Sequence, residues 1–210
     1  MTDNPVFCGL AVIFTFLVLL NVRSLFKIIP SLLDSVTRWK GSLQLEDSLQ
    51  LSGSRNLVAV LLFVPFCMVA YSHSLYHLDY LDDLSPALGL AATCGTFLAY
   101  LILRTFLNWQ LEMSSYHTKT FTAANRSFYN YTIILFILLF PTAGLLDAFA
   151  VDESLTRNIL LYLTALTYLI YIFRRGQIFA SACNPFTTFL YLCGLELLPT
   201  AALVLSARLL

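Results

Sequence analysis

Apolar residues occur in six long runs along this chain, and shorter polar segments separate them. Each run is close to the roughly 20 residues that a helix needs to cross a bilayer core about 30 Å thick. The pattern predicts a single all-α membrane bundle over residues 1–210. Its six transmembrane helices are expected at residues 6–27, 57–76, 87–108, 131–150, 157–174 and 186–207.

The composition agrees with a surface that faces lipid. Hydrophobic residues make up 59% of the chain and charged residues 11%, and the mean hydropathy is +0.78. A soluble protein carries about a quarter charged residues, because its surface faces water. The lipid bilayer is therefore an expected partner. Nucleic acid is not, because the formal net charge is zero and no basic face is evident.

Basic residues concentrate in alternate segments between the runs. Lysine and arginine resist translocation, so their position marks the cytoplasmic side. Acidic residues collect in the other segments, at 79–83 and 152–153. This division predicts a multi-pass protein with both termini outside the cytoplasm. The basic residues that follow the first, third or fifth run are Arg23, Lys27, Arg38, Lys40, Arg55, Arg104, Lys119, Arg126, Arg174 and Arg175, which leaves only Arg157 and Arg208 elsewhere.

The polar segments carry patterns of their own. Residues 31–43 place apolar side chains, Trp39 among them, at helical spacing beside basic residues, which is typical of a short amphipathic helix in the cytoplasmic interface. Packing of that helix on the bundle is the alternative, and the two are compatible. Residues 44–56 are polar and contain glycine, so they predict a connector. Residues 109–130 predict a polar cytoplasmic loop.

Glu196 lies in the middle of the last run, about 15 Å from either end at 1.5 Å rise per residue. A charge at that depth is costly and usually faces the bundle interior with a partner. Pro199 frees a backbone carbonyl beside it, and Thr200 lies one turn on. The niche predicts either a proton-, ion- or solute-binding carboxylate or a glutamate that ties helices together. The candidate partners for this carboxylate on other helices are Tyr100, Thr164, Thr167, Tyr168 and, if its side chain reaches inward, Arg104.

Four arginines lie in the last turns of helices that end at the predicted cytoplasmic side. Their long side chains favour an extension to lipid phosphates at the interface. If the fold clusters them, they form an anion-binding site instead. These candidates are Arg23, Arg104, Arg174 and Arg175.

The sequence contains few other candidates for metal binding or catalysis. His73 and His77 stand at i and i+4, with Asp79 nearby, which is only a weak metal signal because such combinations are common. No complete catalytic motif and no cofactor fingerprint occur in the sequence, so an enzyme acting on lipids ranks behind the other functions.

The stretch Thr188-Phe-Leu-Tyr-Leu-Cys-Gly-Leu-Glu-Leu-Leu-Pro199 resembles the ending of a family of small bacterial membrane proteins, the domain of unknown function 4271. Arg23 after the first run and Ser54-Arg55-Asn56 before the second are compatible with it. The resemblance implies a bacterial inner membrane location. It implies no catalytic residues, because the family has no established activity.

The sequence is compatible with two functions. Glu196, together with three predicted helices that contain a proline (Pro65, Pro141 and Pro199), favours binding or movement of a small solute, ion or lipid through the bundle. The small size and large apolar surface favour the alternative, a non-catalytic subunit or assembly partner of a larger membrane complex.

Overall fold

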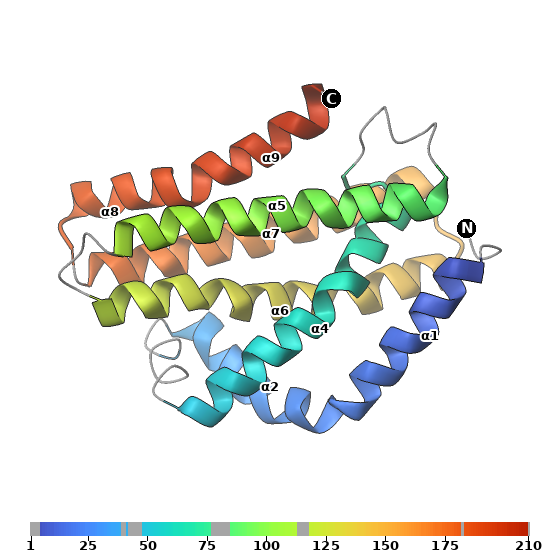
Figure 1. The fold of residues 1–210 in the computed structure, drawn as a ribbon, viewed down its shortest axis with the longest axis horizontal. Helices are drawn as coiled ribbons and strands as arrows, with labels where there is room; N and C mark the ends of the chain where they lie inside the picture. Colours follow the sequence, from blue (N-terminus) through green and yellow to red (C-terminus); the bar gives the residue numbers. More distant parts are fainter. Residues whose placement is uncertain are drawn as a thin grey trace.

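The computed structural model describes residues 5–38, 41, 48–76, 85–112, 118–181 and 183–209, and nearly all of these are helical, with no strand among them (Figure 1). This confirms the predicted all-α membrane bundle. The helices are α1 (Pro5–Leu20), α2 (Val22–Thr37), α4 (Leu49–Ser72), α5 (Pro86–Glu112), α6 (Thr118–Ala148) and α7 (Glu153–Ala180). The C-terminal segment consists of α8 (Pro185–Leu192), the π-helical turn η2 (Cys193–Leu197) and α9 (Leu198–Leu209).

Within the described ranges, five helices are long and apolar enough to cross a membrane, and a bent pair adds a sixth if it counts as one span. The bent pair is α1 with α2, whose axes differ by 70°. The five others are Leu51–Ser72, Pro86–Gln110, Phe121–Ala148, Glu153–Ala180 and Pro185–Ala207.

The first predicted span, residues 6–27, is not one straight helix. α1 ends at Leu20, and the side-chain amide of Asn21 donates to the carbonyl oxygen of Leu17 at 3.0 Å. Asparagine competes in this way for helical backbone groups, which favours a break. The chain then turns into α2, so the apolar run continues in a new direction.

The segment predicted as an interfacial helix belongs mainly to α2 and packs on the bundle. Ile28, Leu32 and Ser35 of α2 are buried, whereas Leu33 is exposed. Residues 31–37 therefore pack on the bundle, which was the alternative to a helix lying in the interface. Trp39 and Leu43 lie outside the described residues.

Two predicted non-helical segments are largely helical. Residues 49–56 of the expected connector open α4, and residues 118–130 of the expected loop open α6. Residues 109–112 extend α5, while 113–117 lie outside the described part of the chain. The 31 residues of α6 span about 46 Å, well beyond a bilayer core of about 30 Å. The boundaries drawn from hydropathy were too short because a helix does not end where the hydrocarbon ends.

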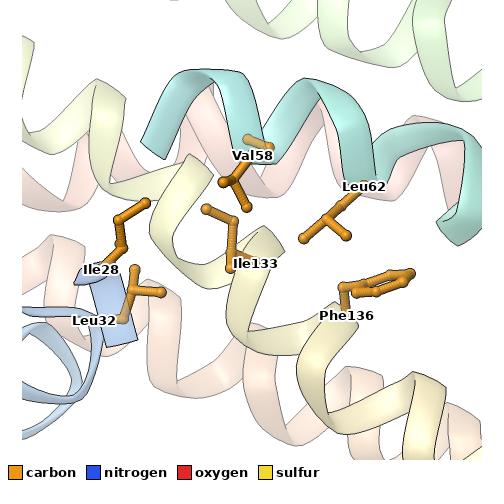
Figure 2. Packing of buried hydrophobic residues seen from close by; sticks show 7 residues of the cluster. Ile28, Leu32, Val58, Leu62, Ile133 and Phe136 are labelled. Atoms are coloured by element: carbon orange, nitrogen blue, oxygen red, sulfur yellow. The ribbon is translucent and has the colours of Figure 1, made fainter. Parts of the chain in front are cut away.

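One apolar cluster joins α2, α4 and α6. Ile28 and Leu32 meet side chains of α4 and α6, and Figure 2 shows Val58 facing Ile133 and Leu62 facing Phe136. Between helices in lipid, such contacts stabilise through van der Waals packing rather than removal of water. On the other side of α6, the helices α5 and α7 run beside it, with the C-terminal segment alongside them (Figure 1). We call the end where α6 begins the inner end, after the predicted orientation, and the opposite end the outer end.

The predicted orientation is testable with two single substitutions at exposed turns. Ser154 lies at the outer start of α7 and Ser181 at its inner end, and both are exposed. In intact cells, a membrane-impermeant maleimide should label Ser154→Cys, whereas Ser181→Cys should react only after permeabilisation. The unsubstituted chain, with its own five cysteines, is the control. The reverse labelling pattern would overturn the predicted orientation.

Candidate functional site

Glu196 is fully buried and faces Arg104 of α5. Its Oε1 accepts from Nη2 of Arg104 at 2.9 Å, and its Oε2 lies 3.4 Å from Nε of the same arginine. The exposed fraction is 0% for the Glu196 side chain and 3% for that of Arg104. This two-point contact is the geometry in which a guanidinium binds a carboxylate most strongly.

A second arginine, Arg175 of α7, binds the same carboxylate. Its Nη1 donates to Oε1 of Glu196, and both side chains are 0% exposed. Its Nη2 donates to Oδ1 of Asn108 at 2.7 Å. Its Nε is buried and has no hydrogen-bond partner. Two guanidiniums therefore share one carboxylate, which leaves one positive charge uncompensated among these three groups.

Polar and aromatic side chains complete the shell around the three charges. The hydroxyl oxygen of Tyr171 accepts from Nη2 of Arg104 at 2.8 Å and from Nη1 of Arg175 at 2.6 Å. The side-chain amide of Asn108 donates to the carbonyl oxygen of Arg104 at 2.7 Å. The Arg104 guanidinium lies 3.9 Å from the centre of the Phe128 ring, within the range of a cation–π contact.

The backbone that carries Glu196 is not α-helical. η2 is a π turn, in which the amide of Leu198 donates to the carbonyl oxygen of Cys193, five residues back. Pro199 follows directly, and its ring excludes the normal bond to the carbonyl of Leu195. The wider turn accommodates that loss. Such π turns inside helices occur frequently at functional sites.

Thr200 links the turn to α5 and α7. The Tyr168 hydroxyl lies 3.0 Å from Oγ1 of Thr200 and 3.2 Å from the carbonyl oxygen of Glu196. The Tyr100 hydroxyl lies 3.3 Å from the same Thr200 oxygen. The predicted niche of Glu196, Pro199 and Thr200 therefore lies in a hydrogen-bonded contact between three elements.

Apolar side chains close the cluster toward both ends of the bundle. Toward the inner end, α6, α7 and the C-terminal segment contribute Phe121, Ala124, Ile178, Phe179 and Leu195. Toward the outer end, Phe97 and Leu203 pack with Tyr76, whose hydroxyl lies 2.7 Å from Oγ of Ser206. The charges thus lie between two apolar layers.

The four candidate arginines have three different environments in the structure. Arg104 and Arg175 are buried against Glu196, so neither extends to the lipid headgroups. Arg174 donates from Nη2 to the carbonyl oxygen of Thr37 at 2.9 Å and so joins α7 to the end of α2. Arg23 is exposed on α2.

The weak metal candidates are only partly described. His73 lies at the outer end of α4, with Nε2 3.8 Å from Oδ2 of Asp147. His77 and Asp79 lie outside the described residues.

Among the partners that sequence reasoning proposed for Glu196, Arg104 contacts the carboxylate and Tyr168 contacts the backbone. Thr164 and Thr167 instead donate to carbonyls of their own helix. Sequence reasoning missed Asn108, Tyr171 and the pairing of Arg175. A signal was present, because polar groups repeat at helical spacing. They are Tyr100, Arg104 and Asn108 on α5, and Tyr168, Tyr171 and Arg175 on α7.

The family model described as Domain of unknown function (DUF4271) matches residues 6–205. No curated protein and no solved structure matches the chain.

Removing the shared carboxylate should destabilise the bundle strongly. In Glu196→Gln two buried guanidiniums lose their counter-charge, and breaking a buried ion pair costs roughly 3–5 kcal/mol. We expect a clearly lower midpoint of thermal unfolding for the purified protein in detergent.

Glu153→Gln, at an exposed position on α7, is the matched control and should leave the midpoint unchanged. A double-mutant cycle with Arg175→Gln measures the coupling directly. Additive effects of the two substitutions would contradict the shared ion pair.

Proposed function

The chain belongs to the domain-of-unknown-function family DUF4271, and we propose that it binds a small carboxylate anion at Arg104, Glu196 and Arg175 and moves it through the helix bundle. One observation carries the proposal. Two arginines with almost no solvent exposure share a single carboxylate, so the cluster has an excess positive charge.

An uncompensated charge inside a membrane protein is costly, because neither water nor an ion partner stabilises it. A bound anion would bring the cluster to two positive and two negative charges. Guanidinium groups suit this task because their planar set of N–H donors matches a carboxylate. The buried Nε of Arg175 is a donor still without a partner.

Glu196 acts in this proposal as the built-in anion of the empty site. It presents to both arginines the same chemical group that the solute carries. A solute carboxylate therefore competes with Glu196 for the guanidinium donors. This competition keeps solute binding from becoming too tight for release.

The C-terminal segment is the element best suited to move. It carries Glu196 on a π turn next to Pro199, where the regular α-helical bonds are already interrupted. Hinges in helices arise at prolines and π turns. The apolar layers on both sides of the charges correspond to an occluded state, and displacement of α8 or α9 would open one side at a time.

Arg175→Gln removes the excess charge and should weaken the binding of anions. We expect the affinity for succinate, measured by titration calorimetry on the purified protein, to fall at least about tenfold, the effect of one lost charged hydrogen bond. Arg157→Gln is the matched control, because Arg157 lies on the same helix but is exposed. That control should bind succinate like the unsubstituted protein.

Undiminished succinate binding by Arg175→Gln would contradict the proposed site. Absence of anion binding by the unsubstituted protein, together with a membrane protein that copurifies in fixed ratio, would instead favour the subunit role.

Glu196→Gln should bind anions more tightly and exchange them more slowly. The variant leaves two guanidiniums without an internal competitor, so added acetate or succinate should raise its unfolding midpoint more than that of the unsubstituted protein. In proteoliposomes, its exchange of labelled succinate should be slower than that of the Glu153→Gln control. An equal stabilisation of both proteins by the two anions would contradict the competitor role of Glu196.

A further inference from the structure

α4 meets α5 in the outer half of the bundle, and ring contacts fix how the two helices face each other (Figure 1). The rings of Phe66 and Phe97 pack edge to face, with their centres 5.2 Å apart. Nearer the outer end, a Cβ on Gly89 would lie only 2.7 Å from the Tyr71 ring, so this ring lies directly on the glycine. Residue numbers rise along α4 as they fall along α5, as in any antiparallel pair of helices.

Between these two contacts, Cys67 of α4 faces Cys94 of α5. A hydrogen bond joins their side chains, and both cysteines are free thiols. The polar neighbours of Cys94 bond differently, because the hydroxyls of Thr93 and Thr96 donate to carbonyl oxygens of their own helix. A buried cysteine normally acts as a small apolar side chain. Two thiols that bond to each other across a helix contact are also placed to form a disulfide.

The two thiols differ in exposure. Cys67 is 0% exposed, whereas Cys94 is half-buried and borders the exposed residues Gly95 and Leu98. Cys94 lies eight residues inside the candidate span Pro86–Gln110, about 12 Å at 1.5 Å rise per residue, so its exposed side faces hydrocarbon. Reactive cysteines are partly exposed. An oxidant therefore has to be soluble in lipid, and the thiol that it reaches first is that of Cys94.

We propose that Cys67 and Cys94 are a redox-active pair, which a lipid-soluble quinone converts to a disulfide that ties α4 to α5. The Cys94 sulfur adds to the quinone ring, and the Cys67 sulfur then attacks the Cys94 sulfur. The S–S bond forms as the bond between sulfur and the ring breaks. The two sulfurs lose two electrons to the quinone, and the two thiol protons leave on the quinol.

The depth of the pair suits a disulfide that is broken and re-formed. In the predicted orientation Cys67 lies five residues before the outer end of α4 at Ser72, about 8 Å. Disulfides persist outside the cytoplasm, whereas cytoplasmic reductants keep thiols reduced. The pair shares no residue with the proposed carboxylate site, and its oxidation is measured without any anion. Either proposal can therefore fail alone.

A protein that keeps only these two cysteines tests the proposal. Cys8, Cys183 and Cys193 are replaced by alanine, and the purified protein in detergent is mixed with decylubiquinone under argon. We expect both thiols to be lost from the monomer, with one quinol formed per chain, and both to return after treatment with dithiothreitol. Thiols are counted in the denatured chain by the mass that a maleimide adds, and quinol is measured by its absorbance.

A second protein that keeps Cys94 and Cys193 is the matched control, with the other three cysteines replaced by alanine. Cys94 precedes Arg104 by ten residues, about 15 Å along α5, whereas Cys193 lies three residues before Glu196, the partner of Arg104. This control has the same reactive thiol but no second thiol within its reach. It should form neither quinol nor an intrachain disulfide.

The unsubstituted protein provides a measurement that does not depend on the folding of either variant. Trypsin cuts after lysine and arginine, so Cys67 and Cys94 lie together in peptide 56–104. After quinone treatment this peptide should lack two hydrogens and resist alkylation until it is reduced. Retention of both thiols in this peptide, or an equal yield of quinol from the control protein, would overturn the proposal.

Discussion

Burying a charged side chain inside a membrane costs free energy, and this bundle buries three of them in one cluster. The way in which its helices pack around the cluster depends on the pairing of these three charges. Glu196, Arg104 and Arg175 come from the C-terminal segment, α5 and α7, so their ion pairs join three elements that are distant in sequence. Tyr171 and Asn108 satisfy further donors of the same arginines. None of these groups is stable alone at that depth, and the packing of α5, α7 and η2 is coupled to their pairing.

Hydropathy was sufficient to predict the fold class but not the course of each helix. It marks residues that lie in hydrocarbon, and α6 continues through thirteen described residues before its predicted start, from Thr118 to Asn130. It also merged α1 and α2 into one run, because the break at Asn21 changes direction and not composition. Hydropathy averaged over about twenty residues does not register a single asparagine side chain that competes for a helix carbonyl.

The position of Glu196 could be predicted from the sequence, but its pairing with Arg175 could not, again because hydropathy does not give the end of a helix. The depth of Glu196 follows from counting residues along one helix, and so does its proximity to Pro199 and Thr200. Its pairing with Arg175 depends on how far α7 extends past the predicted span, which ended at residue 174. An arginine just beyond a hydropathy boundary is normally assigned to the interface. Here the helix continues to Ala180, and the side chain turns inward to a carboxylate.

The balance of charge is the observation that favours the proposed binding site over a structural tie. One arginine is sufficient to neutralise Glu196, and a tie between helices would be complete with Arg104 alone. The second buried guanidinium adds a desolvation cost that no internal carboxylate in the described cluster offsets. A buried Nε on that same arginine remains without a partner. Both features are costly by themselves, and the proposed carboxylate anion would offset both of them.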